Sequence, residues 1–345
     1  MISKLNLYPR FYSMFVYSFS YLTFSCVQMI IKLKHSKMSV CVIFVALSLT
    51  VLQTKGFVTG RGCPAPKVEA QNNDSIKTPF PLIYPDVDSM LTILRLPQFS
   101  EHEGVQGLLR LYEKAKEKKA EFQERNYKKN HPLIILEGLA GSGKSTLVSG
   151  LSKKINGVQS HSPSSAVETL KDKFVNNPLL DNIYHRFAHY ITALEVYILL
   201  KDSPVVLDRY WHSSATYSIA RAAYNTNGKY ILPPKGDKIY NWPDDLLKPD
   251  VVLYLNVDED VREKRLYKRG KQNDDTALTA EEKEKIEKNF GKNERLLQRC
   301  PEYRNNMILA YKNMANPEVT MVNANLSIDE VLNAAYQKVA PLLKQ

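Results

Sequence analysis

Cysteine is scarce in this chain of 345 residues, and most of it lies near the beginning. Cys26, Cys41 and Cys63 fall within the first 63 residues, and Cys300 alone belongs to the remainder. A body with one thiol has no disulfide framework of its own. We therefore expect Cys300 to be a buried or inert thiol rather than a reactive one, in a chain that suits a reducing compartment.

Acidic residues are absent from the first 68 positions. The Lys and Arg residues of that stretch carry eight of the eleven formal positive charges, so residues 69–345 carry only +3. A nucleic-acid-binding domain normally presents a basic face. The nearly balanced charge of the body therefore argues against nucleic acid as a partner.

The acid-free leader contains two uncharged runs, residues 11–31 and 38–54. A basic, Ser-rich start without acids is typical of an organelle transit peptide. The first run is also long enough to cross a bilayer, and the stretch from Met38 to about Gly60 is similar to a secretory signal. The residues leave these three interpretations open. The bilayer-spanning interpretation implies membrane contact through the leader.

Composition divides the chain into three parts. Residues 1–63 form the leader, and residues 64–130 contain a Pro-, Asn- and Lys-rich linker followed by a charged segment. The charged segment, residues 101–129, has a thin apolar stripe at helical spacing, so we expect a helix that packs on the main domain. The main domain is predicted over residues 131–345.

Long alternating strands are also lacking; the apolar runs of the body are short and continuous. They are PLIILE at 132–137, VVLD at 205–208, VVLYLNV at 251–257 and VTMVNA at 319–324. Such runs indicate strands buried on both faces of a parallel sheet. Helical segments lie between them, so the pattern predicts a three-layer α/β domain. Ser327 and Glu330 form a capping-box pattern before the last helical segment.

The stretch LEGLAGSGKSTL follows the first apolar run and contains the spacing G-x-x-x-x-G-K-S. Glycines in such a loop let backbone N–H groups point at phosphate oxygens, and the next helix adds the positive end of its dipole. We expect Lys144 to bridge the outer phosphates of a nucleotide and the Ser145 hydroxyl to ligate Mg²⁺. The predicted phosphate loop comprises Gly138, Leu139, Ala140, Gly141, Ser142, Gly143, Lys144, Ser145 and Thr146.

A second polar group follows the run at 205–208, in the sequence VVLDRYWHSSATYSIA. Asp208 and Arg209 come at the carboxyl end of that predicted strand, the edge at which ligands bind in open α/β sheets. Asp208 would hold Mg²⁺ through water, and the planar fork of Arg209 would clamp phosphates. Further along a helical stretch, Tyr210, Ser213 and Tyr217 could line an acceptor pocket.

A third group follows the run at 251–257. Arg262, Arg265 and Arg269 recur at i, i+3 and i+7, so they share one helix face, and Gly270 then frees the chain. This arrangement suits a lid that brings positive charge to a phosphoryl group and excludes water. The neighbouring acids would also allow a solvated basic face, and the other two motifs favour the lid.

Together, GLAGSGKST, DRYWHSSATYSIA and RLYKRG resemble the thymidylate kinase family of P-loop nucleoside monophosphate kinases. SPSS at 162–165 and YNWPDDLLKPD at 240–250 look closer to its mitochondrial UMP/CMP kinase branch. The resemblance covers about residues 131–342. It implies a three-layer P-loop kinase fold with a parallel sheet, flanking helices and a mobile lid. It also implies transfer from ATP, with Mg²⁺, to CMP, UMP, dCMP or dUMP, giving diphosphates.

The resemblance assigns roles residue by residue. Catalytic roles fall to Lys144, Asp208, Arg209, Arg265 and Arg269, and Mg²⁺ to Ser145 and Asp208. The chain departs from the family at Ala140, where thymidylate kinases usually carry an acid that contacts the acceptor sugar. It also lacks the loop arginine that some members have at the position of Gly141. Arg186 is the counterpart we expect for the family's base-reading arginine, in the segment IYHRFAHY.

Several alternatives stay open. A thymidylate kinase would take dTMP. A deoxynucleoside kinase would need a general base after the second strand of the family's fold, which lies between the runs at 132–137 and 205–208, because its acceptor hydroxyl must lose a proton. The stretch QSHSPSSAVE at 159–168 has no early carboxylate there, since Glu168 comes late and His161 is a poor base. A nucleotide-binding protein without activity is the alternative from another class. No N-K-x-D element supports a switch GTPase.

The resemblance also bears on place and partners. The UMP/CMP kinase branch is mitochondrial, so we expect the mitochondrion, with membrane anchoring or the secretory pathway as alternatives suggested by the leader. The expected partners are a pyrimidine nucleoside monophosphate and no nucleic acid, and a homodimer is a candidate assembly.

Overall fold

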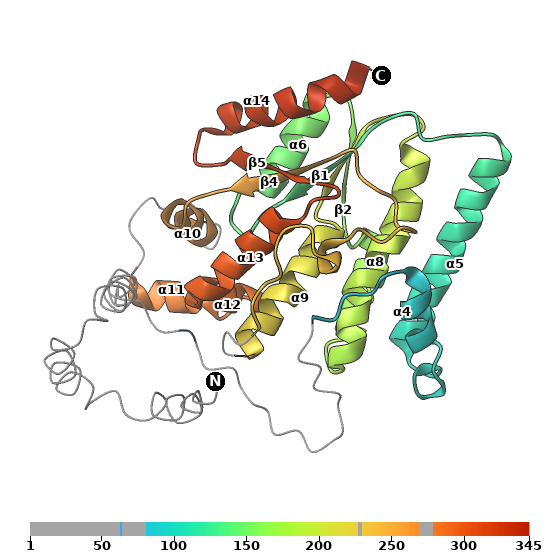
Figure 1. Cartoon of the computed structure of the whole chain (residues 1–345), viewed down its shortest axis with the longest axis horizontal. Coiled ribbons are helices and arrows are strands. Elements are labelled where there is room, and N and C mark those ends of the chain that lie inside the picture. The colour runs from blue at the N-terminus through green and yellow to red at the C-terminus, as the bar shows by residue number, and fades with distance from the viewer. Residues whose placement is uncertain (1–62, 64–80, 227–229, 269–278, 345) are drawn as a thin grey trace, which may run out of the picture. The chain divides into compact units, whose positions relative to one another are not determined.

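The computed structural model describes Cys63 and residues 81–226, 230–268 and 279–344 (Figure 1). A sheet of five parallel strands runs through this part of the chain in the order β2-β3-β1-β4-β5. The strands are β1 (Leu133–Glu137), β2 (Val158–His161), β3 (Val205–Asp208), β4 (Val251–Asn256) and β5 (Val319–Asn323). Four coincide within one residue with the predicted apolar runs. The remaining strand, β2, has no such run because it is an exposed edge strand.

The helices of the described residues alternate with these strands. They are α4 (Val87–Leu94), α5 (Glu103–Glu124), α6 (Lys144–Lys154), α7 (Ser165–Glu168), α8 (Pro178–Leu199), α9 (Trp211–Asn225), α10 (Glu259–Lys268), α11 (Ala280–Glu287), α12 (Lys292–Arg299), α13 (Pro301–Asn313) and α14 (Ile328–Val339). The predicted capping box starts α14, where Ser327 accepts from the backbone N–H of Glu330 and the Glu330 carboxylate accepts in return.

Successive residues of β1 point to opposite faces of the sheet, and each face has its own core. Leu133 and Ile135 join the core that contains α5, α8, α9 and α13, whereas Ile134 and Leu136 join the core beneath α6 and α14. Figure 1 shows α6 and α14 together on one side of the sheet. The predicted three-layer α/β fold is therefore confirmed.

The charged helix α5 packs on α8, as expected. Its apolar stripe, which includes Leu108 and Tyr112, is buried in the same core as α8, and the ring of Tyr112 lies 4.9 Å from that of Phe187. The short helix α4 buries Met90 and Leu94 in this core as well. The described residues from Cys63 onward accordingly belong to one compact unit.

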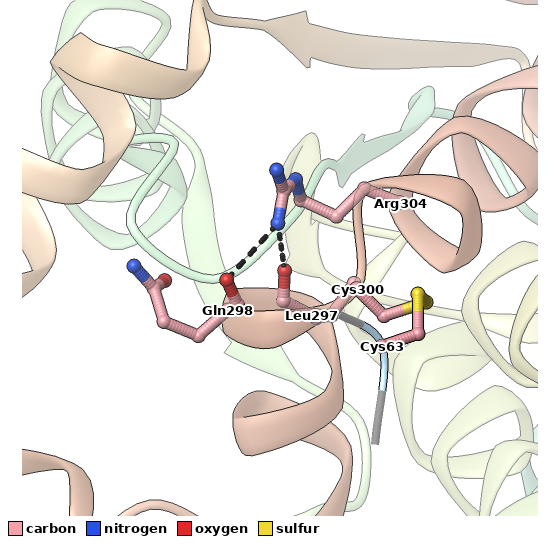
Figure 2. The surroundings of a disulfide bond; sticks show 5 residues. All are labelled: Cys63, Leu297, Gln298, Cys300 and Arg304. Carbon is pink, nitrogen blue, oxygen red and sulfur yellow. Dashed lines mark hydrogen bonds between the residues drawn. A yellow bond between two sulfur atoms is a disulfide. The ribbon is translucent and has the colours of Figure 1, made fainter. Parts of the chain in front are cut away.

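A disulfide joins Cys63 to Cys300, which corrects the expectation of an isolated body thiol (Figure 2). The two residues are 237 positions apart in sequence, yet their Cα atoms lie 4.5 Å apart. The fold creates this proximity, and the sequence spacing contains no sign of it. Because disulfides persist mainly in oxidising compartments, the bond also argues against the expected reducing surroundings.

Among the residues that the structure describes, no helix has both the length and the apolar character needed to cross a membrane. The leader and the linker up to residue 80, apart from Cys63, lie outside the described residues. The predictions made for them are not addressed by the structure.

Candidate nucleotide-binding and phosphoryl-transfer site

The predicted phosphate loop lies between β1 and α6, as its motif requires. Gly138, Gly141 and Gly143 have φ values of 150°, 86° and 98°, a region that favours glycine. A Cβ atom at Gly141 would lie 2.9 Å from the carbonyl oxygen of Arg262. The ammonium of Lys144 donates to the carbonyl oxygens of Gly138 and Leu139, at 2.9 Å each. The loop is thus closely packed, and Lys144 lies folded across it.

Two oxygen ligands meet where β1 and β3 lie side by side. The register pairs Leu136 with Asp208, which brings Asp208 to the first turn of α6. The Ser145 hydroxyl donates to Asp208 Oδ2 at 3.3 Å, whereas the buried Asp208 Oδ1 has no hydrogen-bond partner in the described part of the chain. A hydroxyl and a carboxylate are the hard oxygen donors that Mg²⁺ prefers. Their chemistry and the orphaned oxygen fit the predicted metal site.

Arg209 has the left-handed backbone conformation, with φ of 64°. For a non-glycine residue this conformation costs about 1–2 kcal/mol. The backbone N–H of Arg209 donates to the carbonyl oxygen of Leu136 at 3.0 Å, and its guanidinium donates to the Ser213 hydroxyl at 3.2 Å. The chain therefore turns sharply at the end of β3 and holds the arginine at the carboxyl edge of the sheet.

Glu137, the last residue of β1, fixes this turn, and the sequence interpretation missed it. Its carboxylate is fully buried and accepts from the backbone N–H groups of Tyr210 and Ser213, at 2.9 and 3.1 Å. The hydroxyls of Ser213 and Tyr311 donate to its second oxygen at 2.6 and 2.9 Å. The available signal was an acid at the end of an otherwise apolar buried strand.

Burial raises the pKa of Glu137, while the nearby charge of Arg209 and the hydrogen bonds from Ser213, Tyr210 and Tyr311 act in the opposite direction. Burial by itself would lower the pKa of Arg209, but its neighbours, chiefly Tyr217, raise it above the ordinary value. The arginine is therefore held fully protonated at physiological pH. A charged, positioned guanidinium is what phosphate recognition requires.

The expected acceptor-lining residues divide into two kinds. Tyr210 is fully buried, and its hydroxyl donates to the carbonyl oxygen of Leu247 at 3.1 Å, so it belongs to the core rather than to an open pocket. Ser213 is bound to Glu137 and supports Arg209. Tyr217 is half-buried beside Arg209.

Arg186 lies where α8 meets α9. The residues Ser162, Arg186, His189, Ser214 and Ser218 form what we call the α8–α9 seam. The Arg186 guanidinium donates to the carbonyl oxygens of Asn182 and Ser214, at 2.6 and 3.1 Å, and to the Ser218 hydroxyl. Burial lowers its pKa to about 10, so the group stays charged at neutral pH.

His189 completes the α8–α9 seam. One ring nitrogen lies 2.7 Å from the Ser162 hydroxyl, which follows β2, and the other lies 2.7 Å from the Ser214 hydroxyl. Burial lowers the pKa of His189 to about 3, which keeps the imidazole neutral. The seam is therefore a chain of hydrogen bonds from the end of β2, through α8, to α9.

The arginines of α10 do not act as one face. Arg262 is only 1% exposed and binds the Glu259 carboxylate, the Gln298 side chain and the carbonyl oxygen of Ala140, so it supports the phosphate loop from behind. Arg265 is half-buried and donates to the carbonyl oxygen of Ala324 at 2.8 Å. Arg269 lies outside the described residues. Residues three positions apart on a helix are offset by about 60° around its axis, which separates Arg262 from Arg265.

A cavity of about 330 Å³ adjoins the phosphate loop. The glycine loop and α6 form one wall, and the segment from the end of β5 into α14 forms another. It is lined by Gly141, Ser142, Gly143, Thr146, Leu147, Gly150, Leu255, Arg265, Lys268, Ala324, Leu326, Ile328, Val331 and Leu332. Leu326 and Ile328 are 41% and 68% exposed, which is high for apolar side chains. An apolar slot next to basic groups and backbone N–H donors suits a flat ring joined to phosphates.

The family model described as deoxynucleoside kinase matches residues 134–307, half of the chain. The chain belongs to the deoxynucleoside kinase family. The match begins in β1 and ends in α13, so it includes the phosphate loop, Asp208, Arg209 and the α8–α9 seam.

Named relatives agree with this family. Mitochondrial UMP-CMP kinase 2 of Homo sapiens is 29% identical over 208 residues, which cover 60% of this chain and 42% of the human protein. A thymidylate kinase of Legionella pneumophila (strain Paris) is 24% identical over 223 residues, 61% of this chain and 95% of that enzyme. The match thus spans less than half the length of the human relative.

Solved structures of similar proteins include a thymidylate kinase from Candida albicans. It has a TM-score of 0.42 and 20% identity, with coverage of 61% of this chain and 92% of the other. A deoxyadenosine kinase from M. mycoides with bound dATP has a TM-score of 0.40 and 20% identity, covering 60% and 99%.

Three predictions are confirmed at this point. The resemblance to thymidylate kinases and to the mitochondrial UMP/CMP kinase branch is confirmed, as is the P-loop kinase fold. The predicted enzyme class is confirmed as well, since this member of the deoxynucleoside kinase family is a kinase of nucleosides or nucleotides. The roles given to individual residues stay predictions.

Proposed function

We propose that this kinase transfers the terminal phosphoryl group of ATP to a pyrimidine nucleoside monophosphate, CMP, UMP, dCMP or dUMP. The family establishes a nucleoside or nucleotide kinase. The sequence strings shared with the UMP/CMP kinase branch support the pyrimidine monophosphate, together with the name of the human relative.

One observation carries the choice of a monophosphate over a nucleoside. A sugar hydroxyl must lose its proton on phosphorylation and needs a general base with a suitable pKa, whereas a phosphate acceptor is already ionised. In residues 158–168, all of them described, the acid that follows β2 is Glu168, which is exposed. The nearby His189 is held neutral between two serines and has its pKa lowered by burial to about 3. Neither group suits the role of a base.

The donor side of the proposal rests on the phosphate loop. Lys144 would exchange the carbonyl oxygens of Gly138 and Leu139 for phosphate oxygens, which bind an ammonium more strongly. Ser145 and Asp208 would hold Mg²⁺, which neutralises phosphate charge when bound. The cavity beside the loop would take the base of ATP, with Arg265 on its wall.

Arg209 would contact both nucleotides. It lies at the edge of the sheet beside Asp208, and Glu137 and Ser213 hold it in place. Transfer needs the two phosphates brought together and their charge neutralised, which a fixed guanidinium supplies. Arg186 would read the acceptor base and Tyr217 would line its pocket. Arg269 remains a prediction for the lid.

The substrate is tested with the full-length chain, ATP and Mg²⁺ against CMP, dCMP, UMP, dUMP, dTMP and deoxycytidine. We expect ADP release with the cytidine and uridine monophosphates. Release with dTMP alone would establish the thymidylate kinase alternative, and release with deoxycytidine alone the deoxynucleoside kinase. A chain that binds ATP but releases no ADP with any acceptor would be a silent binding protein.

Two observations bear on where the protein works. The human relative is named mitochondrial, which supports our proposal of the mitochondrion. The disulfide instead favours the oxidising secretory pathway, the alternative suggested by the leader. Fractionation of cells that express a tagged full-length chain separates the two, because secretion into the medium contradicts the mitochondrial proposal. Membrane contact through the leader and a homodimer stay predictions.

A further inference from the structure

The disulfide lies at the junction of two helices. Cys300 ends α12 and begins α13, and it is only 1% exposed. Cys63, its partner, is exposed. Cys63 is therefore the half of the bond that is open to a dissolved thiol, while Cys300 is shielded by the protein.

Arg304 clamps this junction. It lies one turn along α13, and its backbone N–H donates to the carbonyl oxygen of Cys300 at 3.2 Å. Figure 2 shows its guanidinium donating to the carbonyl oxygens of Leu297 and Gln298, at 2.6 and 3.2 Å. The last turn of α12, the disulfide and the first turn of α13 are thus held as one piece.

Arg304 and Gln298 also connect the junction to the phosphate loop. Arg304 pairs with the Glu259 carboxylate at 3.2 Å, and Glu259 also binds Arg262 at 2.7 Å. The side-chain oxygen of Gln298 accepts from Arg262 at 2.8 Å. Arg262 in turn donates to the carbonyl oxygen of Ala140 at 2.8 Å. A shift of the α12–α13 junction therefore acts on the group that supports the phosphate loop from behind.

We propose that the Cys63–Cys300 bond is a thiol-exchange site whose oxidation state sets the affinity of the phosphate loop for its nucleotide. The identity of that nucleotide as ATP rests on the proposed function. The oxidised form holds the junction and, through Gln298 and Arg262, the loop. Reduction releases Cys63 from the junction and loosens the support.

The exchange is a two-step reaction with a small thiol of the glutathione class. The thiolate of a first molecule attacks the accessible sulfur of Cys63, and the Cys300 sulfur leaves as a thiolate. A second molecule attacks the mixed disulfide and releases Cys63. The two protons of the small thiols end on Cys63 and Cys300, and the two small molecules leave joined as a disulfide. Oxidation by the small disulfide reverses these steps.

The test compares the oxidised and reduced full-length chain by ATP affinity and by hydrogen exchange. We expect reduction to weaken ATP binding about fivefold, at the lower end of coupling between linked sites. We also expect faster amide exchange in the last turn of α12 and in the phosphate loop. Cys63→Ser should match the reduced form whether or not reductant is present, and Cys41→Ser should respond like the unaltered chain.

Each outcome decides the proposal. Equal ATP affinity and equal amide hydrogen exchange in the oxidised and reduced states overturn it. So does a free Cys300 thiol, detected by mass spectrometry of the chain alkylated without reduction. If Cys63→Ser does not fold, titration of the unaltered chain with reductant gives the same two measurements. A redox-dependent ATP affinity without phosphorylation of any monophosphate would uphold this proposal and refute the proposed function, so the two failures are distinguishable.

Discussion

The proposed donor and acceptor sides of the site differ in the partners of their polar groups. Beside the phosphate loop there is a cavity of about 330 Å³, and Asp208 Oδ1 is buried without a hydrogen-bond partner among the described residues. In the α8–α9 seam, by contrast, Arg186 and His189 are bonded to serines and backbone carbonyls. On the donor side a buried carboxylate oxygen is left for a ligand, whereas Arg186 and His189 already have partners within the protein.

This difference predicts how the two substrates bind. A buried oxygen without a partner costs about 1–3 kcal/mol, which a ligand recovers. The donor side is therefore largely preformed, with Lys144 as a group that must still change partners. An acceptor must break bonds within the seam before it can replace them, so its binding is coupled to a movement of α8 against α9.

In the proposed mechanism Arg209 contacts both nucleotides, so its loss should have the largest effect. We expect Arg209→Ala to lower turnover about a thousandfold, the scale for losing a positioned transition-state contact. ATP affinity should largely survive, because Lys144 and the loop amides remain. Turnover measured with the preferred monophosphate, together with ATP titration, checks both parts. A comparable collapse of ATP binding would place Arg209 on the donor side alone, and unchanged turnover would remove it from the mechanism.

Gly141 tests the donor side by itself. Its φ is 86°, and a Cβ atom there would meet the Arg262 carbonyl oxygen at 2.9 Å, which cannot yield without shifting α10. We expect Gly141→Ala to weaken ATP binding about a hundredfold, or roughly 2.7 kcal/mol, and to leave the KM for the acceptor nearly unchanged.

Gly236 supplies the matched control for this substitution. Its φ is 87°, yet a Cβ atom there would meet nothing within 4 Å. Gly236→Ala therefore carries the same backbone strain without the contact, and its ATP affinity should equal that of the unaltered chain. Equal effects of the two substitutions would show that strain rather than crowding at the phosphate loop is responsible.

The two sides also differ in how far the sequence reveals them. The positions of the phosphate loop and of Asp208–Arg209 in the fold were predictable because each lies at the end of a buried strand, β1 or β3, that an apolar run marks in the sequence. Glu137 and Cys300 were missed because their partners, Ser213 and Cys63, lie 76 and 237 positions away. Tyr210 was placed in the pocket because helical spacing does not say which face a neighbouring helix covers. The strands were predictable wherever both faces are buried, and β2 was not.

The seam itself has a pH signature, the smallest of the expected effects. Unfolded His189 takes up a proton below about pH 6.5, whereas burial lowers the pKa of the folded residue to about 3. The unfolded state therefore binds more protons in this window, and the free energy of unfolding falls as the pH is lowered through it. At about pH 5 the loss from His189 should be about 2 kcal/mol relative to about pH 7.5.

His189→Gln should remove about 2 kcal/mol of that difference, as measured by urea unfolding at the two pH values. His212 is also buried, with a pKa lowered by burial to about 4, so the variant keeps a similar share of the acid sensitivity. His161→Gln is the matched control, because that ring is exposed and should leave the pH dependence as it was. The free energy of unfolding of His189→Gln and of His161→Gln could instead fall by the same amount between the two pH values. His189 would then not be held neutral, and the seam would be more open than the donor–acceptor contrast requires.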